Sequence, residues 1–206
     1  MGRLGIDTRS SLSMHVTEYG PLPEVPRRRG SVPGDLVEPV EISGLRGRGG
    51  GWFPTVRKLR AVVESSAERG RLGRTRHPLV IANGMEGEPA SSKDAVLLGA
   101  SAHLVFDGIS AAAATIGATD AFLAIHRDSA VIPILVKALD ERHAAGIDPL
   151  TIHLVTPPAR YVASEESAVA IAMPADGPSF GTAPAGTWMW TSRSSNQSDA
   201  RPSCAE

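Results

Sequence analysis

A glycine-rich basic segment is the first feature of this 206-residue chain that could do chemistry. Four glycines fall within residues 47–51, so the backbone there can turn with positive φ and come close to a ligand. Consecutive N–H groups in such a loop form an anion-binding nest, and a following helix adds its positive N-terminal end. Arg48 and Lys58 would supply positive charge. The segment therefore predicts a phosphate site, with a flexible linker as the alternative. It is not a P-loop, because no Gly-Lys-Ser/Thr closes it.

An acidic turn is the second feature. Residues 83–89 (Asn-Gly-Met-Glu-Gly-Glu-Pro) follow a short apolar run at 78–82, and Lys93 and Asp94 come soon after. A turn beyond the carboxyl end of a strand is where open α/β sheets bind their ligands. Carboxylate and amide groups there suit ribose or ribityl hydroxyls and ring N–H groups. The alternative is a polar turn whose glutamates are solvated.

A third polar segment runs from Tyr161 to Ser167. Ser164 can cap a helix whose first turn holds Glu165 and Glu166, and the helix dipole favours both charges. For this segment alone, capping is a sufficient explanation. Together the three segments predict a nucleotide or flavin site, in which one basic loop binds phosphate and two acidic turns bind hydroxyls and ring edges.

Apolar periodicity predicts the elements that would position these segments. Helices and strands alternate in the middle of the chain, which is typical of a parallel sheet with crossover helices. Weak helical patterns also precede the glycine-rich segment, at 11–18 and 35–42. The expected elements are a helix from Val56 that Gly70 can end, a strand at 78–82, a helix at 102–116 followed by Gly117, a strand at 121–125, a helix at 130–145 and a strand at 151–155.

The composition sets the expected domain organisation. We predict a lead-in at residues 1–42, an α/β domain at 43–170 and an irregular tail at 171–206, with no strand or helix around Trp188 and Trp190. A net charge of −1 gives no indication of a nucleic-acid partner. The single cysteine, Cys204, can form neither an intramolecular disulfide nor a four-cysteine metal or iron–sulfur site.

Neither a signal-peptide pattern nor an apolar run of membrane-spanning length is present in the sequence. We therefore expect a cytoplasmic protein, either free or peripheral to a membrane complex, without direct membrane insertion.

The three segments, in this order, resemble the FMN-binding, NADH-oxidising flavoprotein subunit of respiratory complex I and related diaphorase subunits. Residues 43–58 resemble the glycine-rich FMN loop of that family, 83–94 its Asn-x-x-Glu-x-Glu-Pro segment with the Lys-Asp that follows, and 161–167 its Tyr-x-x-x-Glu-Glu-Thr segment. His103-Leu104 also fits, with the histidine interpreted as structural. The resemblance implies a Rossmann-like FMN-binding α/β fold with a mostly parallel sheet and flanking helices.

The resemblance also implies roles for individual residues. The FMN phosphate and ribityl side would be bound by Gly47, Arg48, Gly49, Gly50 and Lys58. The remaining site residues would be Asn83, Glu86 and Glu165 at the flavin, Phe53, Glu88 and Glu166 on the NADH side, and Tyr161 as a further cofactor-binding residue. Hydride would pass from NADH to FMN without a catalytic side chain, and an iron–sulfur electron-transfer subunit would accept the electrons.

Some positions depart from the family pattern. Met85 stands where an aspartate is usual, Trp52 replaces a small residue, and Val56 replaces a glycine. Beyond residue 170 the family's cluster-binding region does not follow, which suggests a shifted reading frame or a premature end in the parent gene. The expected function is an NADH dehydrogenase flavoprotein domain. The alternatives are a truncated, non-catalytic remnant and an anion-binding scaffold without redox chemistry.

Overall fold

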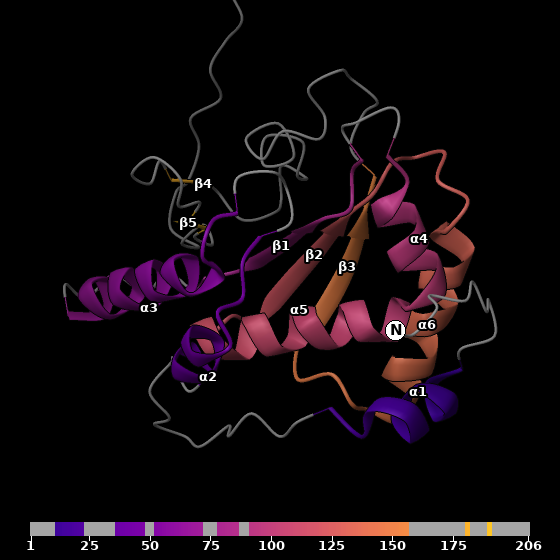
Figure 1. Ribbon diagram of the computed structural model, residues 1–206, viewed down its shortest axis with the longest axis horizontal. Coiled ribbons are helices and arrows are strands. Elements are labelled where there is room, and N and C mark those ends of the chain that lie inside the picture. Colours follow the sequence, from indigo (N-terminus) through magenta and orange to yellow (C-terminus); the bar gives the residue numbers. More distant parts are fainter. Residues whose placement is uncertain are drawn as a thin grey trace, which may run out of the picture.

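A computed structural model describes residues 11–22, 36–47, 52–71, 78–86, 91–156, 180–181 and 189–190. The helices run as α1 (Leu12–Tyr19), α2 (Val37–Ile42), α3 (Thr55–Arg71), α4 (Lys93–Ala100), α5 (Ala102–Ile116) and α6 (Ile132–Ala145). The strands are β1 (Val80–Asn83), β2 (Asp120–Ala124), β3 (Thr151–Val155), β4 (Phe180–Gly181) and β5 (Met189–Trp190). The alternation of helix and strand confirms the expected α/β class (Figure 1).

The central sheet has the order β1-β2-β3, and both strand pairs are parallel. Val80 pairs with Ala121, and Asp120 pairs with Thr151, so the three strands end at a common carboxyl edge. In Figure 1 the three arrows point the same way, and the coil that joins α2 to α3 rises toward the side where they end. The predicted parallel sheet with helical crossovers is therefore confirmed.

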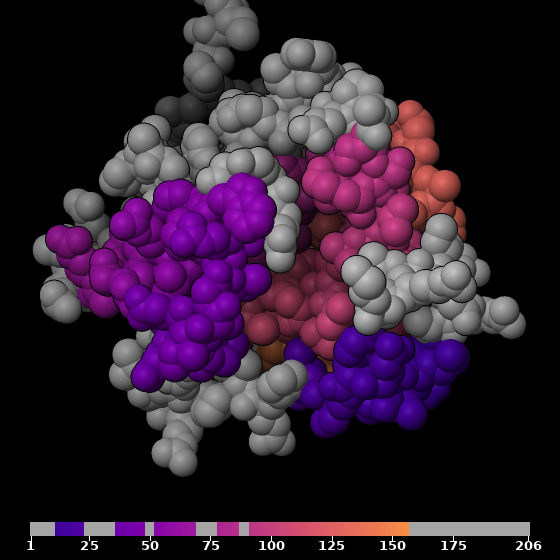
Figure 2. Space-filling model, viewed as in Figure 1, coloured from indigo at the N-terminus to yellow at the C-terminus, as the bar shows by residue number. Residues whose placement is uncertain are grey.

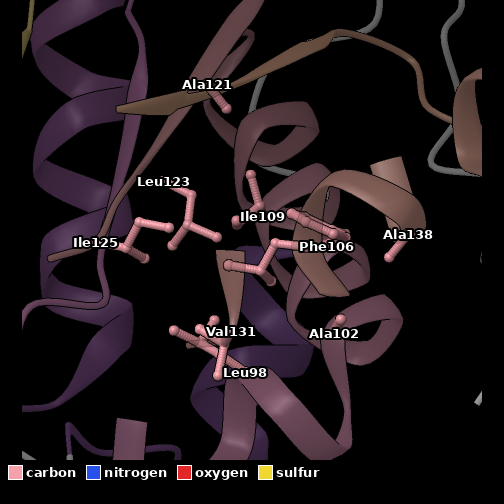
Figure 3. Packing of buried hydrophobic residues seen from close by; sticks show 10 residues of the cluster. Leu98, Ala102, Phe106, Ile109, Ala121, Leu123, Ile125, Val131 and Ala138 are labelled. Atoms are coloured by element: carbon pink, nitrogen blue, oxygen red, sulfur yellow. The ribbon is translucent and has the colours of Figure 1, made fainter. Parts of the chain in front are cut away.

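The main core lies between the sheet and the helices α4, α5 and α6. Phe106 and Leu135 are fully buried, and Leu123 and Ile125 are 1% exposed. Figure 3 shows Phe106 and Ile109 from α5 directed toward Leu123 of β2, with Leu98 and Val131 beside them. Burial of several large apolar side chains, at about 1.5–3 kcal/mol each, makes this cluster the main stabilising unit of the domain.

A second, smaller core cluster lies on the other face of the sheet. Because successive residues of a strand point to opposite faces, Phe122 and Ala124 of β2 face away from the main core. They pack with Leu79 and Met85, which flank β1, and Met85 is only 3% exposed. Apolar residues on both faces explain why β2 reads as an unbroken apolar run.

Glycines end two of the predicted helices, at the expected Gly117 and at Gly146, which was not singled out in the sequence. Gly117 after α5 and Gly146 after α6 have φ of 73° and 62°, the left-handed conformation in which glycine carries no Cβ penalty. The prediction for α3 is wrong in detail, because the helix continues through Gly70 to Arg71. A glycine inside a helix costs only about 1 kcal/mol, so it need not end one.

Two further features differ from the sequence predictions. Helix α4 was not predicted, because its eight residues give too short an apolar pattern to stand out from the turn before it. The expectation of no strand around Trp190 is wrong, since Phe180 pairs with Trp190 and Gly181 with Met189 in a short antiparallel pair. Two-residue strands carry no periodicity that a sequence could reveal.

Within the described ranges, no single helix is both long and apolar enough to cross a membrane; α4 and α5 would pass that test only as a pair, and they meet at a bend of 97°.

Candidate functional site

The turn after β1 is built from short hydrogen bonds. Asn83 ends the strand, and its side-chain Oδ1 accepts a hydrogen bond from the Met85 N–H at 3.0 Å. The Gly84 N–H donates to the Ala124 carbonyl at the end of β2, at 2.8 Å. An asparagine that bonds the backbone two residues on makes the chain turn locally. These two bonds place the predicted site residue Asn83 at the carboxyl edge of the sheet.

Gly84 lies where there is no room for a side chain. A Cβ on this residue would come within 3.0 Å of Leu98 Cδ1, 3.1 Å of the Ala124 carbonyl oxygen and 3.2 Å of Ile125 Cγ2. The glycine thus lets the turn pack directly against α4 and the end of β2. The sequence showed Gly84 only as a turn residue, and its packing role depends on partners far along the chain.

Glu86 is held by the first turn of α4. Its Oε1 is 2.5 Å from Lys93 Nζ, and its Oε2 accepts a hydrogen bond from the Asp94 N–H at 2.9 Å. Hydrogen bonds from Lys93 and then Ser91 lower the pKa of Glu86 to about 2. The carboxylate is therefore ionised at neutral pH and cannot serve as a general acid there. Its side chain is 14% exposed.

His126 also contacts this turn, from the end of β2, and was not predicted from the sequence. It follows the end of β2, and its Nε2 is 3.1 Å from the Glu86 carbonyl oxygen. His126 therefore fixes the backbone of Glu86, and the first turn of α4 fixes its carboxylate. A polar residue after the strand at 121–125 was the available signal, because parallel strands end at the same edge of a sheet.

The glycine-rich loop closes through a hairpin-like pairing of its two arms. The Gly47 N–H donates to the Phe53 carbonyl at 2.9 Å, and the Thr55 N–H donates to the Leu45 carbonyl at 3.0 Å. Arg46 and Pro54 face each other in an isolated antiparallel bridge. Residues 48–51, which connect these arms in the sequence, lie outside the described residues.

Two aromatic rings flank this loop on one arm. The side chains of Trp52 and Phe53 are 60% and 38% exposed, and Lys58 Nζ lies 5.9 Å from the centre of the Phe53 ring. Trp52 has a φ of 46°, the left-handed region that a bulky residue rarely adopts. Exposed rings beside a basic loop suit stacking on a planar ligand.

The departures from the family pattern have structural explanations. Met85 packs in the second core cluster, so an aspartate there would place a carboxylate among Leu79 and Phe122 or force the turn to change. Val56 is 9% exposed on α3, and its side chain adds to the packing of that helix.

The structure thus places the predicted site residues in two groups. Asn83 and Glu86 lie in the turn after β1, together with Lys93, Asp94 and His126. Gly47, Phe53 and Lys58 lie on the hairpin and the first turns of α3. In Figure 2 the purple surface of α2 and α3 and the magenta surface of α4 stand apart, with rose-coloured α5 lower between them. The predicted residues outside the described part of the chain are Arg48, Gly49, Gly50, Glu88, Tyr161, Glu165 and Glu166.

Comparison with known proteins identifies the family. Residues 40–182 match the family model described as the Nuo51 FMN-binding domain. The match covers more than half of the chain, so the protein belongs to this family of FMN-binding domains.

Curated relatives agree with this assignment. An NADH-quinone oxidoreductase subunit of Streptomyces coelicolor is 37% identical over 117 residues, which are 55% of this chain and 24% of that protein. The corresponding protein of Aquifex aeolicus is 30% identical over 148 residues, 66% of this chain and 32% of that protein. The chain thus spans about a quarter to a third of the length of these relatives.

Solved structures support the fold. A chain of the NAD+-reducing nickel–iron hydrogenase in its air-oxidized state superposes with a TM-score of 0.58 at 29% identity, covering 82% of this chain and 27% of that one. The same hydrogenase in its H2-reduced state gives a TM-score of 0.56 at 27% identity. The resemblance to complex I and diaphorase flavoproteins is therefore confirmed.

Proposed function

We propose that this chain binds FMN and NADH and aligns them for hydride transfer, with electrons leaving to an iron–sulfur partner subunit. The family supports FMN as the cofactor. The observation that carries the proposal is that the domain has two ordered polar features of the kind a flavin nucleotide needs. One is a basic, glycine-rich hairpin at the start of α3, and the other is a rigid turn bearing Asn83 and Glu86 at the carboxyl edge of the sheet.

The described residues fit a flavin mononucleotide. Lys58 lies on the first turns of α3, where its ammonium and the positive helix end can attract a phosphate. Asn83 and Glu86 supply an amide and an ionised carboxylate at the strand end, groups that suit ring N–H and ribityl hydroxyls. Bound FMN would supply the hydride-accepting chemistry.

The chain's own part in the reaction is binding and orientation. Phe53 presents an exposed ring against which a nicotinamide or adenine ring can stack. The ionised state of Glu86 excludes it as a proton donor, which agrees with a hydride transfer that needs no general acid. The proposed residues at the loop tip and at 161–166 would complete the binding surface.

Partners and location follow from the same proposal. The relatives are named as subunits of a quinone oxidoreductase, so we expect this chain to act with an iron–sulfur subunit at the periphery of a membrane complex or in a soluble one.

Flavin retention tests the proposal. The purified protein is mixed with FMN, desalted and examined for flavin absorbance, and NADH is then added under anaerobic conditions. We expect retained flavin that NADH bleaches. A protein that retains flavin without bleaching would lack a working NADH site, and a colourless protein would match the non-catalytic remnant.

Lys58→Met sharpens this experiment. Loss of a charge-assisted bond to the phosphate should weaken FMN binding by about 1.5–3 kcal/mol. Lys137→Met is the matched control, because Lys137 is 71% exposed on α6, where it pairs with Glu141 of the same helix. Equal FMN affinity in the two variants would show that Lys58 does not hold the phosphate.

A further inference from the structure

Glu86 is the centre of a small charge cluster at the start of α4. Lys93 Nζ lies 2.5 Å from Glu86 Oε1 and 3.6 Å from Asp94 Oδ2, so one ammonium serves two carboxylates. His126 faces the same residue from the end of β2, through the Glu86 carbonyl. These are the titratable groups that the described structure places around Glu86. With Glu86 and Asp94 ionised, the cluster has a charge of −1, and it would have −2 without Lys93.

The two carboxylates respond to this crowding in opposite ways. Lys93 is the main cause of the lowered pKa of Glu86. Burial and the charge of Glu86 raise the pKa of Asp94. The geometry explains both, because Asp94 shares the ammonium at the longer distance and faces the negative charge of its neighbour.

We propose that Lys93 is a positioning residue that fixes the Glu86 carboxylate and offsets its charge, and that it thereby sets the redox potential of a flavin held at this turn. The inference rests on the proposed function, because it takes the flavin ring to lie against the turn after β1. A flavin gains electrons on reduction, so uncompensated negative charge beside it disfavours the reduced form. The Lys93 side chain is 50% exposed, and solvent screening keeps the effect moderate.

The test measures the midpoint potential of the FMN-loaded protein by anaerobic dye titration. Lys93→Met should lower the equilibrium constant for reduction of the flavin about tenfold. For a two-electron couple this makes the midpoint potential roughly 30 mV more negative. Lys93→Arg keeps the charge and should restore the wild-type value. Lys137→Met is the control. It removes a lysine of α6 whose Nζ lies 3.4 Å from Glu141 Oε1, and it should leave the midpoint potential unchanged.

A second measurement needs no flavin. In the apoprotein, the Glu86 side-chain carboxyl carbon is followed by NMR as the pH is lowered. The wild-type carboxylate should stay ionised to about pH 2, and in Lys93→Met it should take up its proton at clearly higher pH. Unchanged titration in Lys93→Met would overturn the positioning role, and the spectrum also shows whether the variant is folded.

The outcomes separate this inference from the proposed function. Equal potentials for Lys93→Met and Lys137→Met in flavin-loaded protein would overturn the redox role and leave FMN binding intact. A wild-type protein that retains no FMN would overturn both the proposed function and the redox role. The apoprotein titration would then still decide whether Lys93 positions Glu86.

Discussion

Two charged regions of this domain contrast with each other. One is the turn after β1, described above. The other, which we name the Arg142 cluster, lies where α1 packs against α5 and α6 (Figure 1). Its members are His15, His103, Asp107, Ser110, Arg142 and Asp148.

The Arg142 cluster is centred on a fully buried charge. Arg142 is 0% exposed, and its guanidinium lies 2.8 Å from Asp107 Oδ1 and 2.7 Å from Asp148 Oδ1. A further N–H donates to the His103 carbonyl at 3.2 Å, and His15 Nε2 lies 2.6 Å from Asp107 Oδ2. Such a network joins distant elements and presents little of its charge to a ligand.

The turn after β1 and the glycine-rich hairpin before α3 have opposite properties. Lys93 is half exposed, Trp52 is 60% exposed, and the Trp52 backbone has an unfavourable positive φ. Strained backbone and exposed rings that a merely structural role does not require are typical of binding sites. The comparison teaches that charge alone does not mark function here. Accessibility and strain distinguish the candidate site from the Arg142 cluster.

Removing the central charge of the buried cluster should have the largest effect. Arg142→Met leaves Asp107 and Asp148 without their partner, and breaking a buried ion pair from one side typically costs about 3–5 kcal/mol. Urea unfolding measures the free energy of unfolding, and Lys137→Met on the same helix should change it by less than about 0.5 kcal/mol. A loss below about 1 kcal/mol for Arg142→Met would show that the cluster is not a structural centre.

A glycine in the candidate site should be the next most sensitive position. In Gly84→Ala the new Cβ would meet the Ala124 carbonyl oxygen, which cannot move independently of β2, so we expect a loss of about 1–3 kcal/mol. Gly108 is the matched control, since nothing lies within 4 Å of a Cβ there. Gly108→Ala on α5 should stabilise the domain by up to about 1 kcal/mol. Equal stabilities for the two variants would contradict the close packing of the turn.

Between pH 7 and 5, acid sensitivity should come from the Arg142 cluster, because the lowered pKa of Glu86 affects stability only at more acidic pH. Burial first, and then the charge of Arg142, lower the pKa of His103, whose neighbours also include His15 and Glu141 at 3.3 Å. A lowered pKa means that the unfolded chain binds the proton more tightly, so stability falls as the pH drops below the ordinary value of about 6.5.

His103→Leu tests this source of acid sensitivity. His103 Nε2 lies 3.3 Å from Glu141 Oε2, so leucine removes this contact together with the titrating imidazole. We expect the free energy of unfolding to depend less on pH between 7 and 5, by at most about 1.4 kcal/mol per pH unit. An unchanged pH slope in His103→Leu would assign the acid sensitivity to other groups.

The two regions also differ in how far the sequence predicted them. Apolar periodicity located β1, β2, β3, α5 and α6 within a few residues, because each buries a regular face against the sheet. The Arg142 cluster was not predicted, since its bonds join residues 15, 107, 142 and 148 across α1, α5, α6 and a loop. Only His103 drew notice, as a structural histidine, and it is 1% exposed.

For the candidate site, the positions of the residues in the fold could be predicted better than their contacts. Asn83 and Glu86 lie where a strand-end turn must lie in a parallel sheet, and the loop arms precede α3 as expected. The capping of α4 by Glu86 and the contact from His126 could not be predicted, because they depend on how the strand ends and α4 meet in space. The binding roles assigned to all the predicted site residues stay predictions, including those at 48–50, 88 and 161–166.

Relieving the backbone strain at Trp52 should give the smallest change in the free energy of unfolding, and the sign of that change is informative. The left-handed conformation costs a bulky residue about 1 kcal/mol or more, whereas asparagine tolerates it. Because the indole is 60% exposed, its removal sacrifices little burial, and Trp52→Asn should raise the free energy of unfolding by about 0.5–1 kcal/mol. Trp52→Val, with a β-branched side chain at positive φ, should lower it. If urea unfolding shows that Trp52→Asn is more stable than the wild type and Trp52→Val is less stable, the backbone at residue 52 is strained. If Trp52→Asn is instead the less stable protein, the indole holds the hairpin together, and the loop would resemble the Arg142 cluster as a structural element.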